Sequence, residues 1–198
     1  KRILDLTPVE LDREHFHTII DNNVKIPSRT RAVKYNEQSP VNDIVHSINN
    51  LGKIGCSLVM LPCNSAHYFY DEVSKEIEIP WLNMIEIVSS RILDLSYTKP
   101  LILGGYVTTQ KKVYSPYLPE SVYLSESENR MIESIIEKIK IKNSLDKNSE
   151  KTIKNIIKNY DGSIDSILLG CTELPIVIHE DYFLGKKVIS SIDEYINH

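Results

Sequence analysis

The sequence predicts an α/β protein of two pseudo-symmetric α/β domains, with mainly parallel sheets and the active site in the cleft between them. The main observation is that two apolar runs, at 57–61 and 166–170, are each followed closely by a cysteine and a polar residue, at Cys63 and Cys171. Runs of this length are typical of buried strands. The two cysteines are separated by about the length of a small domain. We therefore interpret them as matching positions of an internal repeat.

The first half, residues 1–97, is predicted to alternate strands with helices. Alternating apolar residues indicate a strand at 16–21, and the loop at 22–30 is rich in residues that hold an irregular backbone. A helical pattern then ends at Gly52, a residue common at helix ends. The remaining elements expected in this half are a strand at 57–61, a helix from Ala66 to Ile77, a short strand at 79–82 and a helix at 85–95.

The second half, residues 98–179, begins where the pattern breaks before Pro100. A buried strand at 101–105 runs into two glycines, which indicates close approach of the backbone to another group. Further along, the chain is predicted to form a helix after a capping box at 125–128, a helix at 153–160, a strand at 166–170 and a last strand at 188–193. We expect residues 180–198 to cross back and complete the first half.

Composition limits the possible function. The chain has 198 residues, is 41% hydrophobic and carries a net charge of -4 without a basic stripe, so it can bury a core but is not expected to bind nucleic acid. Three cysteines and the lack of a leader favour a reducing, cytoplasmic location. No apolar run is long enough for a membrane span. No metal is expected, because His67 lacks partners at metal-ligand spacing and is expected to bond local backbone.

The context of two of the cysteines favours chemistry over simple burial. A cysteine beside an apolar run is most often a small buried hydrophobe, and this interpretation suits Cys56. Cys63 and Cys171 instead follow strands at the edge where α/β sheets bind ligands. A helix that begins beside a thiol favours its thiolate, so we expect the thiol pKa values to be drawn from about 8.5 toward neutrality.

Two opposed thiols suit the inversion of a carbon that bears hydrogen. One group must remove the proton from one face while another delivers a proton to the opposite face, and the roles swap in the reverse direction. The carbanion needs further stabilisation, which hydrogen bonds from Asn64, Ser65, Thr172 and amide N–H groups at helix starts can supply. No motif demands pyridoxal phosphate, so we expect no cofactor.

Three blocks of sequence resemble the aspartate racemase branch of the aspartate/glutamate racemase superfamily. They are 22–30, 62–68 followed by 83–86, and 170–175, and they cover nearly the whole chain in the right order. The resemblance implies a cofactor-independent racemase of two pseudo-symmetric α/β domains, acting on a small-molecule amino acid and forming a homodimer. It also implies a glycine-rich turn that we expect to precede Lys1.

The resemblance assigns roles to particular residues. Cys63 and Cys171 become the acid/base pair. Arg29, otherwise most simply a solvated surface arginine, becomes the clamp for the side-chain carboxylate of the substrate. Lys140 becomes the second cation, with Lys142 as a competing assignment because the family's usual glycine is missing nearby. The α-carboxylate is then held by Asn64, Ser65 and Thr172.

The predicted function is the interconversion of L- and D-aspartate. A glutamate or broad-specificity racemase is the nearest alternative, followed by another dicarboxylate isomerase or decarboxylase of the superfamily. A catalytically inactive ligand-binding relative is a third alternative, since the glycine-rich turn is absent from the sequence. The family's threonine after the first strand of the second domain is also replaced near Gly105, where Thr108 could take its role.

Overall fold

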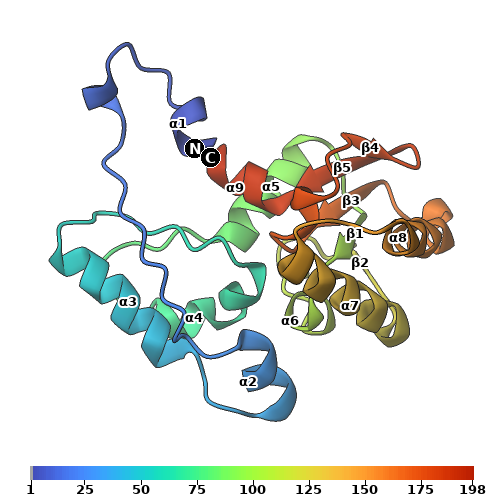
Figure 1. Cartoon of the computed structure of the whole chain (residues 1–198), viewed down its shortest axis with the longest axis horizontal. Helices are drawn as coiled ribbons and strands as arrows, with labels where there is room; N and C mark the ends of the chain where they lie inside the picture. The colour runs from blue at the N-terminus through green and yellow to red at the C-terminus, as the bar shows by residue number, and fades with distance from the viewer. Residues whose placement is uncertain (1) are drawn as a thin grey trace.

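The computed structural model describes residues 2–198, in which the strands form one five-stranded sheet of order β2-β1-β3-β5-β4 (Figure 1). The pairs β2–β1, β1–β3 and β3–β5 are parallel, and β4 pairs with β5 in the antiparallel direction. The predicted α/β class with a mainly parallel sheet is therefore confirmed. The strands are β1 (Pro100–Leu103), β2 (Val122–Tyr123), β3 (Ser166–Leu169), β4 (Tyr182–Phe183) and β5 (Lys186–Ser190).

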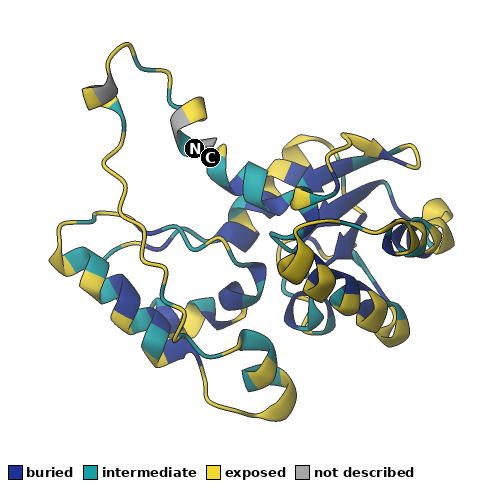
Figure 2. Ribbon diagram, viewed as in Figure 1, coloured by how far each residue is buried: buried dark blue, intermediate teal, exposed yellow. Residues whose placement is uncertain are grey.

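The sheet is covered on both faces, which explains why its central strands are apolar throughout. Every residue of β1 and β3 is buried, as expected for parallel strands between two helical layers. Leu101 and Leu169 belong to the cluster formed with α7 (Glu126–Lys142) and α8 (Lys147–Asn159). Ile102 and Leu168 face the other way, toward α5 (Met84–Asp94) and α9 (Ser191–Ile196). Figure 2 shows this buried core within the sheet layer.

Side-chain caps start the long helices where the sequence predicts them. The Ser125 side chain accepts from the Glu128 amide, and the Glu128 carboxylate accepts from the Ser125 amide, which completes the capping box of α7. Asn83 caps α5 and Asp146 caps α8 more simply, because each side chain accepts from backbone amides of the first turn. The helices predicted in the second half are thus present, although α8 begins at Lys147 rather than at 153.

Of the two glycines predicted to allow close approach, Gly104 does so at the end of β3, whereas a Cβ on Gly105 would meet no atom within 4 Å. A Cβ on Gly104 would lie 2.9 Å from the Gly170 carbonyl oxygen and 3.1 Å from Cγ2 of Thr108. The Gly170 amide donates to the Leu103 carbonyl at 2.7 Å, so the ends of β1 and β3 lie in tight contact. Thr108 is buried against Gly104 and Gly170, and its methyl group lies close to where a Cβ on either glycine would be.

The first half contains helices around a smaller apolar cluster. Besides α5, which packs on the sheet, its helices are α1 (Arg2–Leu6), α2 (Arg29–Tyr35), α3 (Val41–Lys53) and α4 (Tyr70–Val73), with 3₁₀ turns η1 (Asp12–Glu14) and η2 (Asn64–Phe69). The strands predicted at 57–61 and 79–82 reduce to one parallel bridge between Val59 and Trp81. It is held by Val59 N–H to Pro80 O at 2.9 Å and Leu82 N–H to Val59 O at 3.1 Å.

The strand predicted at 16–21 is wrong. Those residues are extended and exposed, with Phe16 71% and Ile20 85% accessible, and they join no ladder within the described chain (Figure 2). Alternation of apolar residues stabilises a strand only when one face packs on a core, and these side chains meet none here. The helix end predicted at Gly52 is also displaced, because α3 continues to Lys53 and the left-handed turn falls at Gly55.

The C-terminal segment differs from prediction as well. The strand expected at 188–193 ends at Ser190, and the next residues form α9. β5 pairs with β3 in the five-stranded sheet, so residues 180–198 do not add a strand to the first half. In Figure 1, α9 lies beside α5, between the sheet and the helices of the first half. No helix formed by the described residues is both long and apolar enough to cross a membrane.

The packing makes a stability prediction for the centre of the sheet. Leu168 is fully buried in β3, so Leu168→Ala should lower the free energy of unfolding by about 2–5 kcal/mol through lost contacts and a cavity. The matched control is Leu93→Ala on α5, where the side chain is 47% exposed and the change should be within about 0.5 kcal/mol. Urea titration of both variants tests this, and equal losses would contradict the described packing.

Candidate active site

The two cysteines occupy matching turns. Cys63 follows the Val59 bridge and leads directly into η2, and its carbonyl accepts from the Ala66 amide at 3.1 Å. Cys171 follows β3 and Gly170 and precedes the 3₁₀ turn η4 (Leu174–Ile176). Its carbonyl likewise accepts from the Leu174 amide at 3.2 Å. Each thiol therefore lies at the end of an extended segment, where the chain turns. Both side chains are partly exposed.

The Cys63 turn places a hydroxyl beside the sulfur. The Oγ of Ser65 lies 3.4 Å from Sγ of Cys63, so the predicted ligand Ser65 is next to the predicted base. Both residues are partly exposed, which leaves them accessible to a small molecule. η2 contacts α2, α5 and α6 (Tyr106–Gln110), so this turn lies against elements of both halves.

Asn64 was predicted to bind the substrate carboxylate, but its side chain is turned into the protein. It is 3% exposed, and the Tyr114 hydroxyl donates to its Oδ1. Its Nδ2 donates to Oγ of Ser191 at 3.0 Å. Because both ends of the side-chain amide are used within the fold, Asn64 is better suited to fix the Cys63 turn than to hold a substrate.

His67 fastens the same turn. Its Nδ1 lies 2.9 Å from the Cys63 carbonyl oxygen and its Nε2 lies 3.3 Å from that of Leu82. The ring also lies 4.7 Å from the ring of Trp81. These backbone contacts confirm the prediction for His67. Burial lowers its pKa to about 4, against the weaker opposing effect of the two carbonyls, so the imidazole is neutral near pH 7.

The Cys171 turn has a different electrostatic character. Sγ of Cys171 donates to Oε2 of Glu173 at 2.8 Å, and Oγ1 of Thr172 lies 3.4 Å from the same oxygen. Burial raises the pKa of the Cys171 thiol, and the negative charge and hydrogen bond of Glu173 raise it further. The expectation that its pKa is drawn toward neutrality is therefore wrong. The structure instead favours the protonated thiol.

Glu173 was not predicted as a site residue, although it contacts both Cys171 and Lys140. It stands two residues after Cys171, directly before the apolar residues of η4, and that placement was the available signal. Its Oε1 lies 3.6 Å from Nζ of Lys140, which partly offsets its effect on the thiol. A chain of charged and polar groups thus runs from Lys140 through Glu173 to Cys171.

Geometry distinguishes the positions of the two lysines. Lys140 and Lys142 both lie in the last turn of α7, where two residues are separated by about 200° around the helix axis. Lys140 reaches Glu173 beside Cys171, so Lys142 extends from a different side of the helix. Lys140 is therefore the cation that the fold brings to the Cys171 turn.

Arg29 begins α2 in the first half. Its guanidinium donates to the Pro27 carbonyl at 3.4 Å, and its side chain is partly exposed. α2 contacts both η2 and α6, so the helix lies beside the Cys63 turn. The loop before it is anchored by Asn23, whose Nδ2 donates to Oγ of Ser47 at 2.8 Å.

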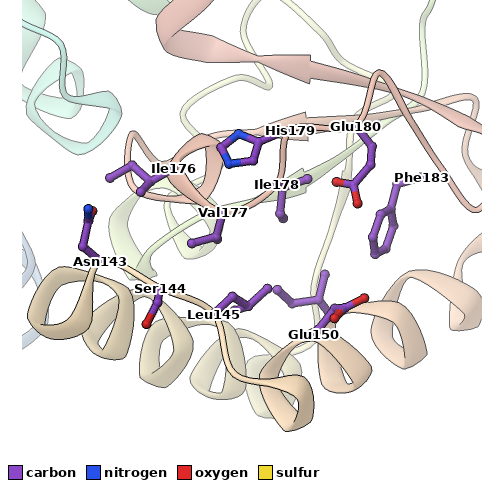
Figure 3. Close-up of a pocket in the computed structure, with 11 residues that line it drawn as sticks. Asn143, Ser144, Leu145, Glu150, Ile176, Val177, Ile178, His179, Glu180 and Phe183 are labelled. Atoms are coloured by element: carbon purple, nitrogen blue, oxygen red, sulfur yellow. The ribbon is translucent and has the colours of Figure 1, made fainter.

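A separate hollow of about 350 Å³ lies between the end of α7 and the segment that leads into β4 (Figure 3). Leu145, Val177 and Phe183 form part of its apolar wall, and His179 and Glu180 supply polar groups. Neither cysteine lines it. Within residues 2–198, no three histidine, cysteine, aspartate or glutamate side chains gather as metal ligands would.

The fold therefore carries two thiols in matching turns, and sequence comparison gives the family of the chain. The chain belongs to the Asp/Glu/hydantoin racemase family, whose sequence profile matches residues 1–198. The resemblance stated from three sequence blocks is therefore confirmed.

Individual relatives differ in substrate. The structure resembles an aspartate racemase of Picrophilus torridus with a TM-score of 0.82 and 27% identity, covering 96% of this chain and 81% of that one. The broad-specificity amino-acid racemase RacX of Bacillus subtilis is 25% identical over 140 residues, which are 68% of this chain and 60% of RacX. A glutamate racemase of Aquifex aeolicus is 25% identical over 180 residues, 84% of this chain and 63% of its own. The chain thus spans less than two thirds of these two curated relatives.

The contact between Glu173 and Cys171 predicts a change in thiol reactivity. Glu173→Gln removes the negative charge, so the pKa of Cys171 should fall and its thiolate fraction at a given pH should rise, about tenfold for each unit of pKa. The measurement is the rate of iodoacetamide labelling of Cys171 from pH 6 to 10, followed by peptide mass spectrometry. Glu180→Gln, an exposed residue nearby, is the control. An unaltered pH profile in Glu173→Gln would contradict the assignment.

The low pKa of His67 predicts a loss of stability in acid. The unfolded histidine binds its proton near its ordinary pKa of 6.5, whereas the folded one binds it near about 4. The contribution of His67 to the free energy of unfolding is therefore fully present above pH 6.5 and decreases as pH falls from 6.5 toward 4. The decrease is about 2 kcal/mol between pH 7 and pH 5. Urea unfolding at these two pH values should show this loss in the wild type but a smaller one in His67→Gln. The exposed His179→Gln should behave like the wild type, and an unchanged loss in His67→Gln would exclude His67 as its source.

Proposed function

We propose that this protein racemises an acidic amino acid, with aspartate as the preferred substrate, by proton exchange between Cys63 and Cys171. The observation that carries the proposal is the pair of thiols in matching turns, in a chain of a racemase family. In one direction Cys63 removes the α-proton as thiolate while the Cys171 thiol donates from the opposite face. In the other direction the roles are reversed.

The environment of Cys171 supports the donor role. Glu173 accepts the hydrogen bond of the thiol, so the group keeps its proton until a carbanion develops beside it. Once that proton is delivered, Lys140 stands close enough to Glu173 to offset the extra negative charge of the turn. This arrangement makes the two thiols unequal at rest, although the reaction needs both.

Stabilisation of the carbanion is assigned to groups of the two turns. Ser65 lies beside Cys63, and Thr172 follows Cys171 with its hydroxyl donating to Glu173 at 3.4 Å. We assign both hydroxyls and the neighbouring amides to the α-carboxylate. As the α-proton leaves, negative charge moves onto that carboxylate, and donors already in place stabilise this state more than the ground state. The side chain of Asn64 is reassigned from substrate binding to support of the Cys63 turn.

Selection of an acidic substrate is assigned to Arg29 and Lys140. A guanidinium can hold a carboxylate in a bidentate manner, and Lys140 adds a second positive charge. The similarity to the aspartate racemase of Picrophilus torridus favours aspartate. Glutamate is the second candidate, because a glutamate racemase matches over 84% of the chain.

The remaining features of the proposal follow from the family resemblance. The thiols can exchange the proton alone, so the proposed reaction uses no pyridoxal phosphate. We also propose a homodimer and a cytoplasmic location. Analytical ultracentrifugation measures the assembly state directly.

The decisive experiment follows both chirality and hydrogen exchange. L-aspartate is incubated in deuterated water, and D-aspartate and Cα deuterium are measured. Cys63→Ala and Cys171→Ala should each lose racemisation by a factor of about 10²–10⁴, the usual contribution of a general acid or base. Cys56→Ala is the matched control and should retain the wild-type rate, because Cys56 precedes the turn and has no proposed role.

Each other outcome identifies a different function. A normal rate in Cys63→Ala or Cys171→Ala would exclude the two-base mechanism. Faster turnover of glutamate than of aspartate would make glutamate the preferred substrate. Release of carbon dioxide would indicate a decarboxylase. Binding of aspartate without exchange of the α-hydrogen would indicate an inactive ligand-binding relative.

A further inference from the structure

Helix α9 is hydrogen-bonded to the backbone on the approach to both cysteines. The Tyr195 hydroxyl accepts from the Leu61 amide at 3.3 Å, and the Ser191 hydroxyl donates to the Leu169 carbonyl at 2.7 Å. Leu61 and Leu169 stand at equivalent places, two residues before Cys63 and Cys171. A single short helix therefore holds the two segments that position the thiols.

The Ser191 hydroxyl also links the two turns directly. It accepts from Nδ2 of Asn64, the residue after Cys63, and donates to Leu169. The path from one cysteine turn to the other thus passes through one oxygen atom. On the other side of Asn64, the Tyr114 hydroxyl donates to Oδ1 and prevents rotation of the amide.

These groups are buried, which makes their positions rigid. Ser191, Tyr195 and Tyr114 are fully buried, and Asn64 is nearly so. A buried donor or acceptor that loses its partner is not compensated by water, so the network resists rearrangement. The Tyr195 hydroxyl also donates to the Leu82 carbonyl at 2.8 Å, which ties it to the bridge beside Val59. α9 itself is seated against α5 (Figure 1).

We propose that Ser191 and Tyr195 are positioning residues that set the separation and direction of the Cys63 and Cys171 thiols. This inference rests on the proposed function, in which both sulfurs flank one carbon atom. Proton transfer between fixed groups depends steeply on distance, and a displacement of about 1 Å can cost about 10²-fold in rate. Neither residue touches the substrate, because each acts through the backbone or Asn64.

The chain offers matched controls for both hydroxyls. Ser89 on α5 is buried, and its Oγ has no hydrogen-bond partner within the described residues. Tyr97 packs against the same core cluster as Tyr195 and is partly buried. Ser89→Ala and Tyr97→Phe therefore remove the same atoms from similar surroundings without breaking the network.

The first test is kinetic. Ser191→Ala and Tyr195→Phe should lower kcat for racemisation by about tenfold or more, with KM within about twofold, because binding groups are left in place. Ser89→Ala and Tyr97→Phe should retain the wild-type kcat. If Ser191→Ala does not fold, Tyr195→Phe decides the question, since it removes a single hydroxyl from an otherwise intact ring.

The second test measures the thiols without turnover, in a Cys56→Ala background. Dibromobimane forms two carbon–sulfur bonds and releases two bromide ions, and it bridges two thiols only when they lie close together. Bridging of Cys63 to Cys171, identified by mass spectrometry, should be several-fold slower in Ser191→Ala and Tyr195→Phe. Labelling of each cysteine by iodoacetamide should keep its rate, which separates changed spacing from changed reactivity.

The outcomes separate this inference from the proposed function. Variants that match their controls in both kcat and bridging would overturn the positioning role, as would an absence of bridging in the parent protein. Bridging that depends on Ser191 in a protein without racemase activity would refute the proposed function and leave the positioning role standing. Racemisation that is unaffected by loss of either hydroxyl would overturn the positioning role and leave the proposed function standing.

Discussion

The parallel register of β1, β3 and β5 brings three strand ends to one edge of the sheet. Leu103 pairs with Leu169, and Leu169 pairs with Ser190, so the next residues of all three strands leave the sheet at the same level. Those residues are the start of the α6 connection, the Cys171 turn and the start of α9. Everything proposed for the site depends on this alignment, because it places a thiol, a bridging hydroxyl and the contact surface for the Cys63 turn side by side.

The two halves contribute unequal chemistry to that edge. The Cys63 turn is held by neutral groups, namely His67 and Asn64, and leaves its sulfur beside a hydroxyl. The Cys171 turn carries a carboxylate at hydrogen-bond distance from the sulfur and a lysine beyond it. Burial raises the pKa of the Cys171 thiol, and that carboxylate raises it further. A repeat that looks symmetric in sequence thus places a hydroxyl beside one sulfur and a carboxylate beside the other.

Much of this fold is predictable from local patterns, and the exceptions share a physical cause. α7 was predictable because its capping box and apolar spacing are local, and β3 because a buried parallel strand is apolar throughout. The segment at 16–21 was mispredicted because its alternation has meaning only beside a partner strand. For the candidate site, the cysteines follow from their sequence motifs, whereas Lys140 was one of two lysines that the family resemblance offered. The link from Asn64 to Ser191 does not follow from a motif, since nothing in either segment specifies a contact between them.

That link also bears on how the protein folds. Asn64 and Ser191 are separated by 127 positions, and Leu61 and Tyr195 by 134. Contacts across such long stretches carry a large loop-closure entropy and form slowly compared with helices and neighbouring strands. We therefore expect the links from α9 to the two cysteine turns to form among the last events of folding. A collapsed chain can hold all its helices and still keep the two sulfurs apart.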